Sequence, residues 1–127
     1  MDELKQKEAA KQIAETAANA LDNKKGMDVT VLEVGDQTIL ADYFVLCTGT
    51  ANTHVRALAD EVEFKLKEEL GVEPNHIEGA SGNAWTLLDY GCVIINIFTT
   101  QARDFYKLER LWSGNELKLE KSEDNQQ

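Results

Sequence analysis

The spacing of apolar residues predicts two amphipathic helices in the first part of the chain. Apolar positions recur at helical spacing over residues 4–21, and residues 24–26, Lys-Lys-Gly, supply the cations and the glycine that commonly end a helix. A second apolar stripe covers residues 55–70 and stops at Gly71. The expected N-cap of this second helix is Asn52 or Thr53.

Shorter apolar runs between the helices predict strands. Residues 27–34 alternate with the period of a β-strand, whereas residues 43–48 are almost continuously apolar, as in a strand buried on both faces near the centre of a sheet. Two further runs are separated by Tyr90-Gly91, which predicts a tight hairpin. The remaining strands are expected over residues 76–78, 85–89 and 92–98, and a last helix over residues 102–112.

This order of elements predicts one α/β domain of the α+β kind. Strands interspersed with helices favour a mixed β-sheet with its helices mainly on one face and much of the other face open for binding. We expect the domain to cover residues 1–113, with a first helix in residues 1–25 and a compact module over 27–113. Residues 114–127 are polar and charged, which is typical of a flexible tail.

The charges are acidic overall and unevenly distributed. The chain has 127 residues and a formal net charge of −10, which argues against nucleic acid as a direct partner. No lysine or arginine occurs in residues 26–55 or 68–102, which include most of the expected strands. The acidic segments either keep a small domain soluble or form a surface complementary to a basic protein.

Other features of the sequence indicate a reducing compartment. No apolar run approaches the length of a membrane-spanning helix, and the charged N-terminus lacks the pattern of a secretion signal, so a cytoplasmic protein is expected. Cys47 and Cys92 lie in or beside apolar runs and are expected to be free thiols that pack as small hydrophobic residues.

The residues that could support catalysis do not form a recognised motif. The candidates are Ser81, His54 and His76, and lone histidines are more often structural than catalytic. The glycine-rich segment 79–82 lacks the lysine of a phosphate-binding loop and favours a flexible linker. We therefore expect no catalytic residue, no cofactor and no metal site.

A candidate interface lies on the strand that begins at Trp85. Side chains alternate along a strand, so Trp85, Leu87 and Asp89 share one face. A carboxylate such as that of Asp89 is rarely buried, which favours an exposed face with an aromatic anchor beside it. Two simpler interpretations remain open: Trp85 covers the sheet edge, and Asp89 stabilises the turn before Gly91.

Three blocks of the sequence resemble the ribosomal silencing factor, or Iojap-like, family. They are residues 42–50 (DYFVLCTGT) with His54-Val55, residues 85–91 (WTLLDYG) with the following Val-Ile-Ile, and residues 103–112 (RDFYKLERLW). Their order and spacing match over residues 27–113, whereas the first helix is similar to the family only loosely. Two positions depart from the family pattern, which often has histidine at the position of Asn96 and an acidic or polar residue at that of Cys92.

The resemblance implies a translational repressor rather than an enzyme. Members of the family bind the large ribosomal subunit through its ribosomal protein fourteen and block joining with the small subunit, on a fold similar to nucleotidyltransferases but without their catalytic residues. A homodimer of the free protein is also possible. The expected partner-binding residues are Trp85, Leu87, Asp89, Glu78 and Asp42. The alternatives are a catalytic or nucleotide-binding domain on the same fold, and an acidic scaffold with unrelated partners.

Overall fold

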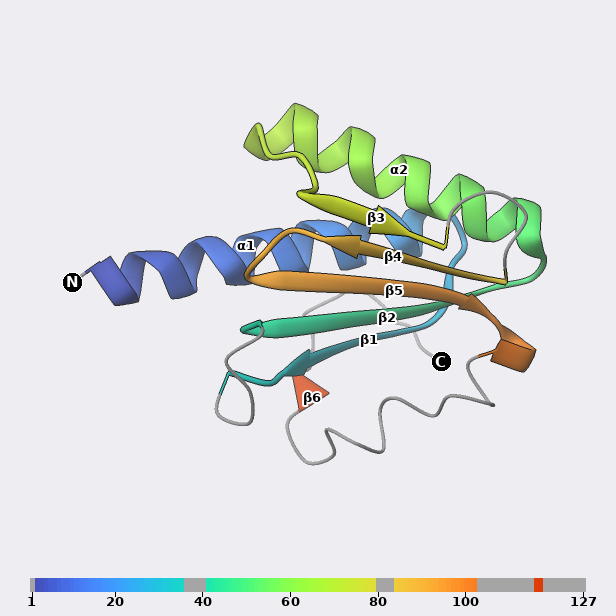
Figure 1. Cartoon of the computed structure of the whole chain (residues 1–127), viewed down its shortest axis with the longest axis horizontal. Coiled ribbons are helices and arrows are strands. Elements are labelled where there is room, and N and C mark those ends of the chain that lie inside the picture. Colours follow the sequence, from blue (N-terminus) through green and yellow to red (C-terminus); the bar gives the residue numbers. More distant parts are fainter. Residues whose placement is uncertain (1, 36–40, 80–83, 103–115, 118–127) are drawn as a thin grey trace.

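The computed structural model describes residues 2–35, 41–79, 84–102 and 116–117 of the chain. The predicted order is confirmed from the first helix to the strand that ends at Thr99, whereas the short strand β6 was not predicted (Figure 1). The elements are α1 (Asp2–Asn23), β1 (Met27–Glu33), β2 (Tyr43–Gly49), α2 (Asn52–Leu70), β3 (His76–Glu78), β4 (Trp85–Asp89), β5 (Val93–Thr99) and β6 (Glu116–Leu117).

The strands form one mixed sheet in the order β3-β4-β5-β2-β1-β6. Strands β2 and β5 are parallel, and the four other neighbouring pairs are antiparallel. The predicted hairpin joins β4 to β5 through Tyr90–Cys92, and every residue of β2 is buried, as its continuous apolar run predicts. The α+β fold with a mixed sheet is confirmed.

Both long helices cover the same face of the sheet, which we call the inner face. Figure 1 shows α1 and α2 lying side by side along it, and contacts between the two helices are extensive. Their buried apolar residues pack with the sheet residues that point inward, including Val45 of β2, Leu88 of β4 and Ile95 of β5. The alternation of side chains along each strand therefore leaves a second set of residues on the opposite face, which we call the outer face.

Helix α2 begins differently from the prediction but ends as predicted. The N-cap is Ala51 in extended conformation, without a side-chain hydrogen bond, so the expected cap at Asn52 or Thr53 is wrong. The preceding turn is held instead by His54, whose Nδ1 accepts the Thr50 N–H (2.9 Å). At the other end Gly71 adopts a left-handed conformation (φ 69°), which a glycine accommodates without steric cost.

The ring of His54 also connects the two helices. Its Nε2 lies 3.0 Å from the carbonyl oxygen of Lys24, in the turn that follows α1. Because Nδ1 accepts from Thr50, the hydrogen must be on Nε2, which donates to Lys24. The histidine is structural in this position, in agreement with the interpretation from sequence.

The C-terminal part of the chain is described only in short pieces. Residues 100–102 are helical, and the remainder of the predicted last helix lies outside the described residues. Within the segment predicted to be a tail, Glu116 and Leu117 pair with Leu32 and Val31 of β1. The division into a domain over 1–113 and a flexible tail stays a prediction. Among the described residues, no helix combines the length and the apolar character needed to cross a membrane.

Candidate functional site

The outer face of β3, β4 and β5 carries a contiguous set of apolar, aromatic and acidic residues. On β4 the residues Trp85, Leu87 and Asp89 alternate with the inward-facing Thr86 and Leu88, as predicted. Residues paired directly across two strands point to the same face. The register therefore places on the outer face His76 and Glu78 of β3, opposite Asp89 and Leu87, and Ile94, Asn96 and Phe98 of β5, opposite Asp89, Leu87 and Trp85.

Only part of the outer face is open. The part formed by β1, β2 and β5 is buried in a second apolar cluster, against which the partly buried Trp85, Ile94 and Ala102 pack. The prediction of a broadly open face is therefore correct only for β3 and β4. The buried members of this cluster are Leu32, Val34, Ala41, Phe44, Leu46 and Phe98.

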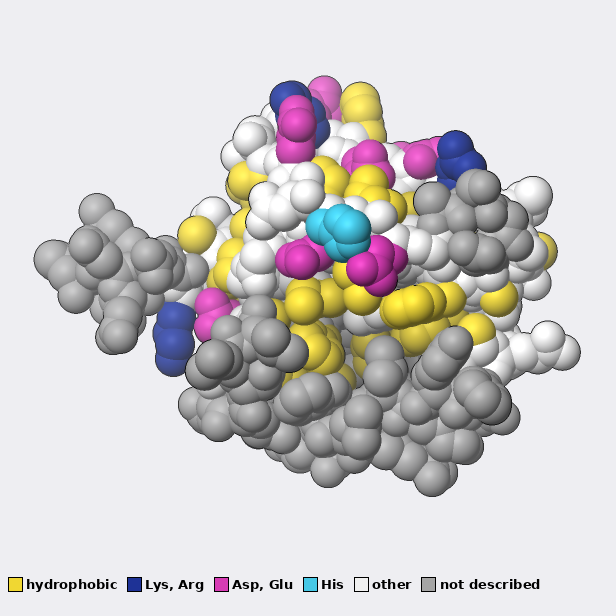
Figure 2. All heavy atoms as spheres, in the orientation of Figure 1, with side chains coloured by type: hydrophobic (Ala, Val, Ile, Leu, Met, Phe, Trp, Pro, Cys, Tyr) yellow, Lys and Arg dark blue, Asp and Glu magenta, His cyan; other side chains and the backbone are white. Residues whose placement is uncertain are grey.

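The open part lies beside this cluster, and we call it the β3–β4 surface. It consists of His76, Glu78, Trp85, Leu87 and Asp89. Figure 2 shows it as acidic and histidine side chains next to a band of hydrophobic atoms.

Trp85 is held in place by a buried polar residue. It is partly buried rather than exposed as predicted, because it packs against the second cluster at the start of β4. Its indole Nε1 donates a hydrogen bond to Oδ1 of Asn96 (3.0 Å). Asn96 is only 3% exposed, so this acceptor has little access to water. The residue that departs from the family pattern thus orients the candidate aromatic anchor.

The acids of the β3–β4 surface differ in their local roles. Asp89 Oδ1 accepts the backbone N–H of Gly91 (2.7 Å), so it stabilises the hairpin turn as the simpler interpretation expected, while its strand position keeps it on the outer face. Glu78 Oε2 lies 2.8 Å from Nε2 of His76 on the same strand. Both histidine and glutamate are exposed, so an incoming basic group can displace this contact at small cost.

Asp42 lies away from the β3–β4 surface. It precedes β2, and its backbone N–H donates to the carbonyl of Cys92, which immediately precedes β5 (2.7 Å). Burial, with a further contribution from the charge of Asp42, raises the pKa of the Cys92 thiol above its usual value. Both cysteines are free thiols, as predicted, and a raised thiol pKa disfavours the reactive thiolate.

The strands of the sheet carry acidic residues but no basic ones. No lysine or arginine occurs in β1 to β5, whereas Asp28, Glu33, Glu78 and Asp89 do. Of these acids, Glu78 and Asp89 lie on the outer face, to which strands β1 to β5 contribute no lysine or arginine. Such a surface attracts basic protein partners and repels phosphate backbones.

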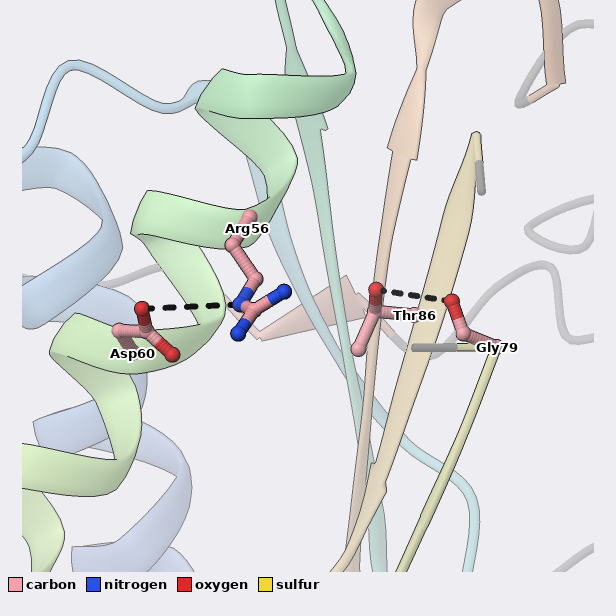
Figure 3. A network of polar contacts seen from close by, with 4 residues as sticks. All are labelled: Arg56, Asp60, Gly79 and Thr86. Atoms are coloured by element: carbon pink, nitrogen blue, oxygen red, sulfur yellow. Dashed lines mark hydrogen bonds and ion pairs between the residues drawn. The ribbon is translucent and has the colours of Figure 1, made fainter. Parts of the chain in front are cut away.

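The junction between β3 and β4 depends on a glycine. Gly79 has φ +72°, and a Cβ there would approach the carbonyl oxygen of Trp85 to 2.3 Å. On the inner side, Thr86 Oγ1 donates to the carbonyl of Gly79 (3.5 Å), while Arg56 and Asp60 on α2 face this part of the sheet (Figure 3). The close approach sets the position of β3 against β4 and thus the shape of the β3–β4 surface.

The candidate catalytic residues are not brought together. His54 on α2 is bonded to Thr50 and Lys24, His76 is paired with Glu78 on β3, and Ser81 lies outside the described residues. No group of three or more His, Cys, Asp or Glu among the described residues is arranged to hold a metal ion.

Comparisons with known proteins agree with the blocks identified in the sequence. Residues 7–127 match the family described as ribosomal silencing factor during starvation. The chain is 35% identical over 101 residues to the ribosomal silencing factor RsfS of Halalkalibacterium halodurans, covering 80% of this chain and 86% of that relative.

Two further similarities concern a solved structure and a mitochondrial protein. A crystal structure from Chromobacterium violaceum superposes with a TM-score of 0.78 at 34% identity, covering 90% of this chain and 92% of that one. The mouse protein named mitochondrial assembly of ribosomal large subunit protein 1 is 28% identical over 96 residues, which cover 73% of this chain and 42% of that relative. The similarity to nucleotidyltransferases stays a prediction.

Proposed function

Because the chain belongs to the ribosomal silencing factor family, we propose that it represses translation by binding the large ribosomal subunit through ribosomal protein fourteen and sterically preventing the small subunit from joining. We place this activity in the cytoplasm, with the ribosomes. The name of the mouse relative, which refers to assembly of the large subunit, supports that subunit as the partner. The β3–β4 surface is the proposed contact.

The observation that carries the proposal is the chemistry of the β3–β4 surface. It joins a partly exposed tryptophan, a partly exposed leucine and two carboxylates on adjacent strands that contain no lysine or arginine. Partly buried aromatic residues are frequent hot spots of interfaces because they bury a large area with little loss of conformational entropy. The two carboxylates attract a basic ribosomal protein, and this attraction mainly raises the rate of association. Asp42 lies beyond β5 and is proposed to act only through its long-range charge.

A steric mechanism makes a specific demand on the order of events. A protein that acts only by occupying its site needs no nucleotide or metal, and its effect follows the occupied fraction of large subunits. Addition before the subunits meet should prevent joining, whereas addition to intact ribosomes should do little because the small subunit covers or crowds the site.

We also propose that two free copies pair through the open part of the outer face, in competition with the ribosome.

Subunit joining followed by light scattering tests the mechanism. Purified large subunits are saturated with the chain, small subunits are added, and the scattering increase is compared with a sample without the chain. We expect the increase to be suppressed in proportion to occupancy and restored on dilution. Normal joining at full occupancy would show that the chain binds without blocking, and the steric mechanism would be wrong.

Two conservative variants test the contribution of charge. Asp89→Asn keeps an oxygen for the Gly91 N–H, and Glu78→Gln keeps a polar group beside His76, so both remove charge with little effect on the fold. Association with large subunits should slow and become less sensitive to salt. Glu8→Gln on α1 is the matched control because Glu8 is exposed and does not belong to the β3–β4 surface. If the association rate of Asp89→Asn and Glu78→Gln depends on salt as strongly as that of the wild type, other charged groups attract the partner.

A further inference from the structure

A second candidate surface lies along α2, on the helical side of the molecule. A pocket of about 560 Å³ is formed by the second half of α2 and the segment that leads to β3. Its volume is in the range of sites that hold a ligand or a few side chains. The residues that line it are Asp60, Glu63, Phe64, Lys67, Glu68, Glu73 and Pro74. None of them belongs to the β3–β4 surface.

The pocket combines an exposed aromatic ring with excess negative charge. Phe64 is 57% exposed, the largest exposed fraction of any large hydrophobic residue in the described part of the chain. Four acids line the pocket against one lysine. Such a combination fits an apolar group that has a cation beside it, because the ring attracts both apolar atoms and cations.

Two of the four acids are already engaged within the chain. Lys67 forms an ion pair with Glu73 across the pocket, and Asp60 lies 3.8 Å from Arg56, one turn earlier on α2 (Figure 3). Glu63 and Glu68 have no ion-pair partner among the residues that the structure describes. Partial burial, and then the charge of Asp60, raise the pKa of Glu63 above its usual value. A carboxylate in this position gains from a neighbouring cation.

A buried hydroxyl lies close to the same place. Tyr90, which is 8% exposed, belongs to the inner core, and its hydroxyl has no hydrogen-bond partner within the part of the chain that the structure describes. Burial, followed by the charges of Glu63 and Glu73, raises the pKa of Tyr90, so both acids are near its ring. Unpartnered buried polar atoms are rare in proteins, and this one lies within electrostatic range of two acids of the pocket wall.

We propose that this pocket is a docking site for a protein segment that presents lysine or arginine beside an apolar side chain. The apolar side chain packs on Phe64 and Pro74, and the cation lies between Glu63 and Glu68. Nucleic acid is disfavoured by the same acids. The site is separate from the proposed ribosome contact, so it provides a second point of attachment on the opposite side of the sheet.

The test uses the isotope-labelled full chain and a short amphipathic peptide of leucine and lysine. Nuclear magnetic resonance titration should shift the amides of residues 60–68 and 73, with little change on β4. A matched peptide with glutamate in place of lysine should not bind. Equal binding of the two peptides, or shifts centred on β4, would overturn the proposal. So would shifts of the same amides with protein concentration alone, because the occupant would then be a second copy of the chain.

Two variants with matched controls locate the site. Phe64→Ala and Glu63→Gln should each weaken peptide binding by about tenfold or more. Ile77→Ala, which truncates another exposed hydrophobic residue, and Glu8→Gln should bind the peptide like the wild type. Phe64→Ala should still bind large ribosomal subunits normally, which separates this proposal from the function of the β3–β4 surface. Unchanged peptide binding in both pocket variants, or loss of subunit binding in Phe64→Ala, would contradict a separate docking site.

Discussion

Replacing Trp85 by phenylalanine should destabilise the fold through a single lost hydrogen bond. The substitution keeps an aromatic ring against the second apolar cluster but removes the indole N–H that donates to Asn96 Oδ1 at 3.0 Å. Because Asn96 is 3% exposed, water cannot readily replace the lost donor. A buried acceptor left without a partner costs about 1–3 kcal/mol, so we expect the free energy of unfolding to fall by roughly that amount.

Replacing the acceptor, Asn96, should lower the free energy of unfolding by less than replacing the donor. Asn96→Leu removes the acceptor, but Trp85 as a whole is only partly buried, so we expect its unpaired N–H to cost less than the unpaired acceptor. In the double variant both polar partners are gone, and its stability should exceed that expected from adding the two single effects. The difference, the coupling free energy, should be about 1 kcal/mol.

Urea unfolding followed by far-ultraviolet circular dichroism measures all four proteins. Circular dichroism is preferred because the chain has a second tryptophan, Trp112, which complicates fluorescence. The reasoning would be refuted if Trp85→Phe unfolds at the wild-type urea concentration, or if the two single effects simply add. Either result would mean that the indole is not fixed by Asn96 and that packing alone positions Trp85.

Three further predictions concern the surroundings of the site. Gly79→Ala should destabilise the chain and displace β3, because its Cβ would meet the Trp85 carbonyl. We expect a lower melting temperature and weaker binding to large subunits. A variant with wild-type melting temperature and binding would contradict the close approach. Cys92 should react slowly with a thiol reagent near neutral pH because its pKa is raised, and Asp42→Asn should speed the reaction; an unchanged rate would mean that the charge does not act on the thiol. Glu63 has a raised pKa in the folded chain, so its contribution to stability is present at low pH and lost as pH rises through the folded pKa. The stability of Glu63→Gln relative to wild type should therefore improve from acidic to neutral pH, and a constant difference in urea unfolding would contradict this.

Much of the fold could be predicted from the sequence because its elements have clear periodicities. The continuous apolar run at 43–48 predicted a central strand, and β2 is buried throughout. The start of α2 could not be predicted in the same way. Local capping rules favour Asn52 or Thr53, yet Ala51 is the N-cap and the preceding turn is bonded to His54. That ring also contacts Lys24, which is distant in sequence, and propensities do not include such contacts.

The candidate site was predictable in its alternation but not in its exposure. Side chains alternate along a strand, so the sequence predicted Trp85, Leu87 and Asp89 on one face, and the strand register confirms this. The exposure of Trp85 depends on Phe98 and Asn96 of the neighbouring strand, and neither could be assigned to it before the register was known. The role of Asn96 was missed for the same reason. A polar residue inside an apolar run is the signal that could have indicated a buried partner.

The position of Asp42 illustrates a limit of reasoning from charge. It belongs to a segment without lysine or arginine, which made it a candidate for the same interface as Glu78. In the sheet these two acids are separated by β4 and β5, so they do not share a contact surface at close range. Charge composition predicts the sign of a surface, whereas the strand order decides which acids act together.

A pair of substitutions on adjacent strands tests the central claim most directly. Leu87 lies on the outer face, and Ile77, paired with Leu88, belongs to the opposite face of the neighbouring strand. Leu87→Lys introduces a cation between Glu78 and Asp89, and Ile77→Lys introduces the same charge on the other side. The measurement is the affinity of each folded variant for purified large ribosomal subunits, with folding checked by circular dichroism. We predict that Leu87→Lys loses about tenfold or more in affinity while Ile77→Lys binds like the wild type. Wild-type affinity of Leu87→Lys, or equal losses in both variants, would contradict binding through the β3–β4 surface.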